Sequence, residues 1–165
     1  MFSLTSAHPN DSAAIETLLD QAFGPDRYNK TSYHFRKGVN DVSSLSFVAN
    51  VDDRLAGTIR FWPVTIGDTS SLLLGPLGVN TEYQSLGIGA ALMNHGMNAA
   101  RDQDYPLVLL VGELDYYGRF GFAQAHSRGI TMPGEQSHRL LVRELKNDAL
   151  SGVEGVVTSI AVSAA

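Results

Sequence analysis

Three residues in one short segment combine the features of a site for a phosphate group. Gln84, Gly87 and Gly89 follow an apolar run at residues 72–79, and a helical pattern begins at the first of the two glycines. Glycines at the start of a helix let a ligand approach the backbone, because no Cβ stands in the way. The first N–H groups of a helix lack partners within it and lie at the positive end of its dipole. The segment therefore predicts a site for a phosphate or a pyrophosphate.

Two commoner phosphate loops do not match this segment. The dinucleotide fingerprint needs a third glycine three residues after the second, where this chain has Leu92. A Walker loop needs a Gly-Lys pair, which the sequence lacks. Two glycines near the start of a helix also commonly form a simple turn. This segment alone is therefore compatible with either a turn or a phosphate site.

A second motif follows a predicted buried strand at residues 107–111, an apolar run bounded by Pro and Gly. It begins at Tyr117, which stands four residues before the pair Gly121-Phe122. In this order, Gln84-x-x-Gly87-x-Gly89 and the tyrosine motif resemble the acetyl-CoA loop and the closing motif of the GNAT superfamily of N-acetyltransferases.

The resemblance extends over about residues 2–142, and its specific part is 74–122. Residues 137–156 also resemble the C-terminal portion of a group of small, broadly annotated bacterial acetyltransferases. The substrates of that group are mostly undefined, so this second resemblance does not narrow the acceptor.

The resemblance implies an α+β fold in a single domain over residues 1–165, with a core at about 2–145 and a C-terminal tail at 146–165. The family's sheet is mixed, mainly antiparallel and flanked by helices, and a splayed strand pair forms the acetyl-CoA cleft. Gly75-Pro76 interrupts the apolar run, and proline cannot donate to a strand ladder. The pair is either a kinked strand end or the bulge that splays the strands, and its place beside the glycine loop favours the bulge.

The resemblance also implies the cosubstrate and the residues that bind it. Acetyl-CoA is expected to donate its acetyl group, and Tyr117 is the candidate proton donor to the departing thiolate, with aromatic packing as its alternative role. The backbone N–H of Val79 is the candidate for stabilising charge on the carbonyl oxygen. The expected cofactor-binding residues are Leu77, Gly78, Val79, Gln84, Ser85, Leu86, Gly87, Ile88, Gly89, Ala90 and Tyr117.

The implied reaction is direct attack of a primary amine on the thioester, which makes the chain an N-acetyltransferase. The general base stays open between Glu113, Asp115 and a water chain, because a carboxylate at either position is also a common turn or helix cap. Two other classes are compatible with the motifs. A non-catalytic acyl-CoA-binding or sensing domain would keep the glycine loop without turnover, and a protein-interaction module would use only the fold and have no affinity for CoA.

The acceptor is expected to be a small-molecule or peptide amine, and the sequence does not identify it. In the family, the segment after the first helix and the strand before the glycine-loop strand border the acceptor site. Trp62 in that strand either forms the wall of a pocket or packs in the core. The other residues that these regions supply are Phe23, Asp26, Arg27, Tyr28, Tyr33 and Arg60.

The composition narrows the class of protein. A chain of 165 residues with 44% hydrophobic and 18% charged residues is long enough for one core. It has no Cys, and its five His show no metal-ligand spacing, so no metal is expected. The formal charge of -5 without a long basic run argues against nucleic acid, and it suits either a cationic acceptor or simple solubility. No signal-peptide or membrane-spanning pattern occurs, so a cytoplasmic protein is expected, and the sequence leaves it open between a monomer and a homodimer.

The hydrophobic periodicity predicts the elements that must position these residues. It indicates a helical start, an antiparallel meander and then a strand-helix-strand unit. Asn10 or Asp11 is expected to cap the first helix, and Pro63 to lie near a strand end or edge. Strands are expected at 2–5, 45–51, 55–64, 70–79 and 107–111, strand-like alternation at 139–145 and 153–160, and helices at 15–23, 26–37, 87–102 and 115–119.

Overall fold

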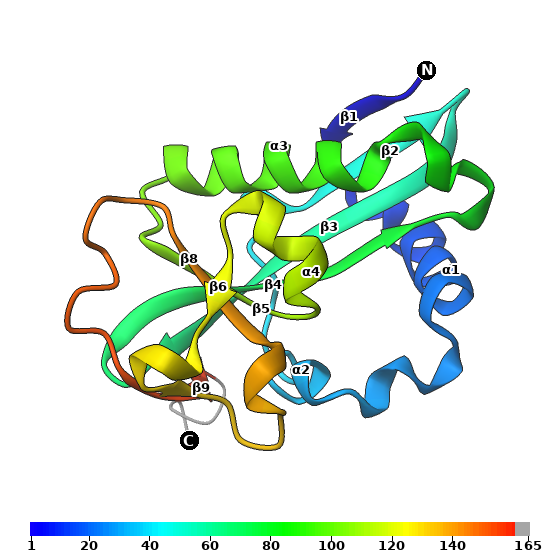
Figure 1. Ribbon diagram of the computed structural model, residues 1–165. Helices are drawn as coiled ribbons and strands as arrows, with labels where there is room; N and C mark the ends of the chain where they lie inside the picture. Colours follow the sequence, from blue (N-terminus) through cyan, green and yellow to red (C-terminus); the bar gives the residue numbers. More distant parts are fainter. Residues whose placement is uncertain (161–165) are drawn as a thin grey trace.

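Short apolar runs alternate with amphipathic segments, and they fold into one mixed sheet with helices on its two faces (Figure 1). The computed structural model describes residues 1–160, so residues 161–165 of the predicted domain lie outside the described residues. The helices are α1 (Ser12–Phe23), α2 (Thr31–His34), α3 (Ile88–Asp102) and α4 (Leu114–Tyr117). The strands are β1 (Ser3–Ser6), β2 (Phe47–Val51), β3 (Arg54–Ile66), β4 (Thr69–Val79), β5 (Leu107–Val111), β6 (Ala123–Gln124), β7 (Ile130–Thr131), β8 (Leu140–Glu144) and β9 (Gly155–Ser159).

The sheet has the strand order β1-β2-β3-β4-β5-β8-β6, and β9 pairs with the far part of β3 and with β7. Strands β2, β3 and β4 form an antiparallel meander. Strands β4 and β5 run parallel, because α3 carries the chain back along the sheet between them. This mixed, mainly antiparallel sheet in an α+β domain is the predicted fold class.

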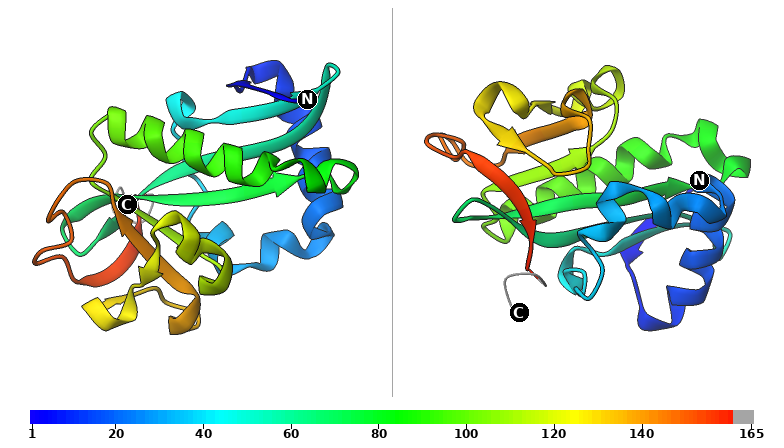
Figure 2. Two further views of the ribbon diagram at one scale, coloured as in Figure 1. Left: turned by 45° about the horizontal axis from the view of Figure 1, so that its top comes forward. Right: turned by 90° about the horizontal axis from the view of Figure 1, so that it is seen from below.

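Helix α3 covers one face of the sheet, and α1 lies on the opposite face (Figure 2, right). The period-2 alternation of the strands supplies both interfaces. In β4, Leu72 and Leu74 join the core cluster beneath α3, whereas Leu73 between them joins a cluster on the other face. In β2, Val48 packs against Ile15 of α1. The two faces of the sheet therefore carry separate cores, and the sheet keeps α1 and α3 apart.

The sequence left two positions open for Pro63, a strand end or a strand edge, and the structure shows the edge, since β3 continues to Ile66. One edge of β3 pairs with β2 as far as Ile59 and with β9 only from Val64. Pro63 lies in the gap between these two partners, where a missing N–H breaks no ladder. The unpaired stretch of edge therefore accommodates a proline inside a long strand.

One helical segment differs from the sequence prediction. The helical pattern expected at 26–37 forms a 3₁₀ turn at Pro25–Asn29 and the single-turn helix α2, because Lys30 between them is extended, with φ −68° and ψ 143°. Strand β9 lies within the alternation expected at 153–160, and it joins the segment after residue 145, expected as a tail, to the sheet, where Leu150, Val153 and Val157 are buried.

Candidate functional site

Strands β4 and β5 separate shortly after they meet. Their parallel pairing comprises Leu72 with Val108 and Leu73 with Leu109. On its other edge, β4 keeps pairing with β3, but Gly75-Pro76 forms a bulge, because Phe61 pairs with Leu74 and Ile59 with Leu77. Gly75 has φ +134°, which an L side chain rarely adopts. The predicted bulge is therefore present, and beyond it β4 has no strand partner toward β5 among the described residues.

The glycine loop lies at the end of β4 and leads into α3. A 3₁₀ segment, Thr81–Leu86, precedes Gly87, which has φ +81° and forms the N-cap of the helix without a side-chain cap. A Cβ placed on Gly87 would meet nothing within 4 Å. Gln84, Ser85, Leu86 and Gly87 are exposed. The start of α3 therefore presents uncapped N–H groups with open space before them, which suits a pyrophosphate.

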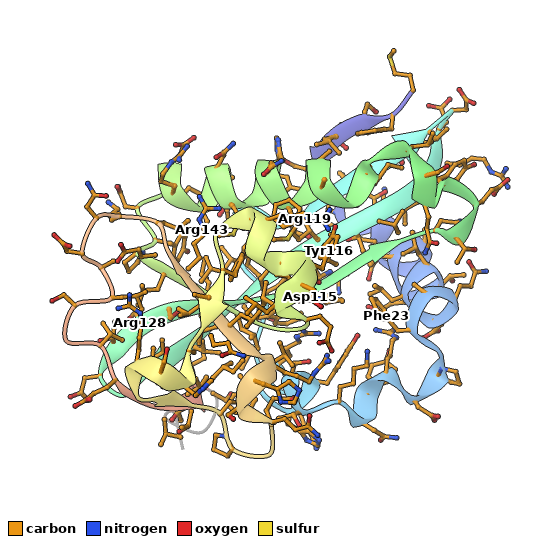
Figure 3. The ribbon with its side chains drawn as sticks, in the orientation of Figure 1. Phe23, Asp115, Tyr116, Arg119, Arg128 and Arg143 are labelled. Carbon is orange, nitrogen blue, oxygen red and sulfur yellow. The ribbon has the colours of Figure 1, made fainter. Side chains whose placement is uncertain are left out.

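The structure adds a basic side chain to this side of the site. Tyr116 of α4 reaches the loop, and its hydroxyl lies 3.4 Å from the position of a Cβ on Gly89. The guanidinium of Arg119 lies 4.8 Å from the centre of the Tyr116 ring, and the two side chains stand together near α3 (Figure 3). The sequence has no Lys or Arg between Arg60 and Arg101, so this approach of Arg119 was not predicted.

Tyr117 lies at the opening between the strands. Its ring packs against the core cluster on the α3 side, 4.9 Å from the Tyr116 ring centre, and it also lines a cavity on the other side. Its hydroxyl has no hydrogen-bond partner within residues 1–160. Burial raises the pKa of Tyr117, the Tyr116 hydroxyl raises it further, and the charge of Arg139 offsets part of the shift. The phenol is therefore protonated at neutral pH and free to donate to a substrate.

The cavity that Tyr117 lines has a volume of about 360 Å³. It extends from the bulge of β4 to the end of α1, where Phe23 lies across from the labelled residues of α4 (Figure 3). Leu77 lines it as well, whereas residues 84–90 of the glycine loop do not. Its lining residues are Phe23, Asn29, Lys30, Thr31, Ser32, Tyr33, Arg36, Leu74, Gly75, Pro76, Leu77, Leu110, Val111, Tyr117, Glu135 and Arg139. The loop and this cavity thus lie on two sides of one opening.

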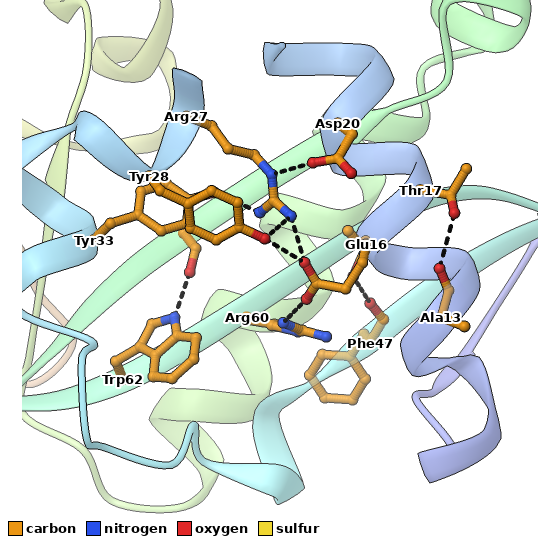
Figure 4. A network of polar contacts seen from close by, with 12 residues as sticks. Ala13, Glu16, Thr17, Asp20, Arg27, Tyr28, Tyr33, Phe47, Arg60 and Trp62 are labelled. Atoms are coloured by element: carbon orange, nitrogen blue, oxygen red, sulfur yellow. Dashed lines mark hydrogen bonds and ion pairs between the residues drawn. The ribbon is translucent and has the colours of Figure 1, made fainter. Parts of the chain in front are cut away.

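A second cavity of about 500 Å³ lies beside the first and is rich in guanidinium groups. Arg27, buried on its wall, donates to Glu16 and, at 2.9 Å, to Asp20 (Figure 4). Arg60 lies 3.4 Å from Glu16. Partial burial by itself would raise the pKa of Glu16, but the bonds and charges of these arginines lower it overall. The carboxylate is therefore ionised at neutral pH.

The residues expected at the acceptor site divide between the two cavities. Phe23 lines the first, Tyr33 lines both, and Asp26 lines neither. Arg27, Tyr28, Arg60 and Trp62 line the second. Trp62 combines the two roles that the sequence left open, since it also packs against the core and donates its indole N–H to the Gly75 carbonyl at 2.6 Å.

The sequence left the general base open between Glu113, Asp115 and a water chain, and the structure places Glu113 at the N-cap of α4 and Asp115 in its first turn. Glu113 forms an ion pair with Arg139, and neither Glu113 nor Asp115 lines either of the two cavities described above. Glu135, from the loop before β8, lines the first cavity and is 14% exposed. Sequence reasoning missed Glu135, because it lies in an irregular segment without a motif.

The sequence pattern of the Acetyltransferase (GNAT) family matches residues 12–122 of this chain. The chain therefore belongs to the acetyltransferase (GNAT) family. The uncharacterized N-acetyltransferase YhbS of Escherichia coli K12 is 30% identical to it over 154 residues, which cover 90% of each protein.

Two crystal structures extend this similarity to the fold. The structure of YhbS from Escherichia coli in complex with CoA has a TM-score of 0.83 at 27% identity, covering 96% of this chain and 89% of that one. The structure of a GNAT family acetyltransferase from Brucella melitensis in complex with acetyl-CoA has a TM-score of 0.71 at 26% identity, and the match covers 96% of this chain and 95% of that one. The predicted family, the fold class and the acyltransferase class are thereby confirmed.

Two further findings concern the residues that the structure describes. None of their helices is both long and apolar enough to cross a membrane. Their His, Cys, Asp and Glu side chains form no group of three or more that could hold a metal ion.

Proposed function

We propose that this chain transfers the acetyl group of acetyl-CoA directly to a primary amine bound in the 360 Å³ cavity. One observation carries the proposal. The separation of β4 from β5 leaves an opening with the exposed glycine loop on one side, the cavity on the other and Tyr117 between them. A thioester entering from the loop side would meet an amine entering from the cavity side at this opening.

The glycine loop is the proposed site for the pyrophosphate of the cosubstrate. Residues 84–90 would bind it through the N–H groups at the start of α3, with space provided by Gly87 and Gly89. The edge of β4 at residues 77–79, which lacks a strand partner in the described part of the chain, would bind the pantetheine arm through backbone groups. The CoA and acetyl-CoA complexes of two similar proteins support this assignment.

The chemistry assigned to the opening is a single displacement. The amine nitrogen forms a bond to the thioester carbon, the carbon–sulfur bond breaks, and the amine loses a proton while the thiolate gains one. Tyr117 is the proposed donor to the thiolate, and the N–H of Val79 the proposed donor to the carbonyl oxygen. Holding the two reactants together supplies most of the acceleration.

The proton lost by the amine needs an acceptor on the cavity side. Glu135 is better placed for this role than Glu113 or Asp115, because it is the carboxylate that lines the cavity. It would act directly or through water. The ion pair between Glu113 and Arg139 gives Glu113 a different task, that of holding the arginine beside the cavity.

Release of free CoA tests the proposed function. The chain is incubated with acetyl-CoA and a panel of small amines and peptides, and the thiol is detected with a chromogenic reagent while calorimetry measures CoA binding. Amine-dependent release is the expected result. Tight CoA binding without release by any amine would instead indicate a binding or sensing domain, and an absence of CoA affinity would overturn both assignments.

A further inference from the structure

Arg36 is a buried cation without an ionic partner in the described part of the chain. The residue is 8% exposed, and its Nε and Nη1 atoms are buried without a hydrogen-bond partner among the described residues. A buried charged group is normally paired, because removing it from water is costly. Burial lowers the pKa of Arg36 to about 10, so the guanidinium is still charged at neutral pH.

The position of Arg36 ties it to the proposed acceptor site. It lines both cavities and therefore stands on the wall between them. Its guanidinium lies 4.5 Å from the centre of the Tyr33 ring and 5.7 Å from that of Trp62. A Cβ on Gly75 would come within 2.7 Å of its Nη2, so the guanidinium packs directly on the β4 bulge.

The surroundings of Arg36 are positively charged, although the whole chain carries a formal charge of -5. Six residues that line the two cavities are Lys or Arg, and two are Glu. Glu16 is engaged by Arg27 and Arg60, and Glu135 lies 3.9 Å from Arg139. Neither carboxylate pairs with Arg36, which is therefore uncompensated in the described part of the chain, and the excess of positive charge makes the cavities attractive to an anion.

We propose that the acceptor is an amine that also bears a carboxylate, and that this carboxylate binds the guanidinium of Arg36. The inference rests on the proposed function of the cavity. A planar guanidinium can give a carboxylate two parallel hydrogen bonds, and Arg36 has no carboxylate partner of its own in the described part of the chain. The substrate class is therefore free amino acids and related small amino carboxylates.

The dimensions of the first cavity agree with this class. Tyr117 and Arg36 line the same space, so one small molecule can place its amine at the opening and its carboxylate at Arg36. A volume of about 360 Å³ lies near the lower end of the range of ligand pockets, which suits a small acceptor.

Matched acceptors provide the test. The standard amino acids and their primary amides differ only in the carboxylate, and rates are compared at equal concentrations of neutral amine. In the wild-type protein, kcat/KM for the preferred amino acid should exceed that of its amide at least tenfold. In Arg36→Gln, kcat/KM for the acid should fall about tenfold to a hundredfold while the amide is unaffected, because a charge-assisted bond is lost.

Two variants control for other effects of the substitution. Arg128→Gln removes an exposed charge that lines neither cavity and should keep the preference for the acid. Arg36→Lys keeps the charge but lacks the planar guanidinium, and it should retain part of the preference for the acid. Unchanged CoA affinity and melting temperature in Arg36→Gln would show that the fold and the cosubstrate site are intact.

The outcomes separate this inference from the proposed function. Equal turnover of acids and amides by the wild-type protein would overturn the carboxylate site and leave acetyl transfer standing. If no acceptor is turned over, the proposed function fails, and calorimetry with the same pairs and CoA-saturated protein decides the site. Binding of acids but not amides, lost in Arg36→Gln, would support it, and equal binding of both would overturn it.

Discussion

The glycine-loop side and the cavity side of the opening are built in different ways. On the loop side, the proposed contacts come from consecutive residues at 77–79 and 84–90, and none of these residues is charged. On the cavity side, the lining comes from α1, the turn after it, α2, β4, β5, α4 and the loop before β8. A site made of backbone N–H groups can lie in one continuous segment, whereas a site made of side chains is assembled from distant ones.

The two sides also differ in how they would attract charge. The start of α3 offers backbone dipoles. Arg119 packs on the ring of Tyr116, whose hydroxyl lies close to Gly89 at this helix start. The cavities instead present guanidinium groups, of which Arg36 is unpaired in the described residues. Substitutions of glycine should therefore harm one side and substitutions of charged residues the other.

Tyr117→Phe probes the point where the two sides meet, and it should have the largest effect. The substitution keeps the ring and removes the hydroxyl, so kcat should fall about tenfold to a thousandfold. The Michaelis constant for acetyl-CoA should stay near the wild-type value, because the contact forms mainly in the transition state. Because the pKa of Tyr117 is raised above the ordinary tyrosine value of 10, the donor should stay protonated to a higher pH than an ordinary tyrosine does. Steady-state kinetics across pH measure both effects.

Tyr116→Phe is the matched control for that substitution. Its hydroxyl lies on the loop side near Gly89, so its removal should change CoA affinity by less than about tenfold, as for one hydrogen bond, and leave kcat intact. Equal losses of kcat in both variants would show that the tyrosine pair is structural and that another group is the acid.

Gly89→Val tests whether the loop side depends on free space at its backbone. A Cβ here would meet only the Tyr116 hydroxyl at 3.4 Å and Val79 at 3.7 Å, so the fold should tolerate the substitution. The branched side chain should weaken CoA binding at least tenfold by calorimetry. Gly87 is unsuitable for this test, because its φ of +81° would strain any side chain.

Gly118→Ala serves as the control for the glycine substitution. A Cβ there would contact only Leu114 at 3.7 Å, away from the loop, so CoA affinity should be unchanged. Wild-type affinity in Gly89→Val would contradict a pyrophosphate site at the start of α3.

Gln84→Ala should have a smaller effect on the same side. If the backbone carries most of the binding, loss of one side-chain hydrogen bond should cost about 0.5–1.5 kcal/mol of CoA binding energy, measured by calorimetry. A loss of several kcal/mol would show that side chains dominate on the loop side as well, and the contrast between the two sides would fail.

Glu16→Gln tests the arginine network of the second cavity through its pH dependence. The folded state lowers the pKa of Glu16, so the stabilisation is present above the ordinary value of 4.5 and is lost as pH falls through the lowered one. At pH 7 the substitution should cost about 0.5–1 kcal/mol of unfolding free energy, since the carboxylate is 42% exposed and solvent screens it. Thermal unfolding at several pH values measures the difference, and a difference that persists in strong acid would exclude the ion pairs as its cause.

The sequence by itself determined the parts of this protein that depend on neighbouring residues. Period-2 and helical patterns predicted strands such as β5 and helices such as α3, because burial of one face follows from local spacing. The bulge at Gly75-Pro76 and the glycine loop were predictable for the same reason, since each is a backbone feature of adjacent residues.

Only the tertiary structure decided where Pro63 could be accommodated and which charged side chains meet at the cavities. The gap between β2 and β9 exists only once both have paired with β3. Arg36 and Glu135 stand 99 positions apart in the chain, yet they line one cavity. Such a meeting depends on how α2, the β4 bulge and the loop before β8 pack together, and no periodicity in any one of these segments records it.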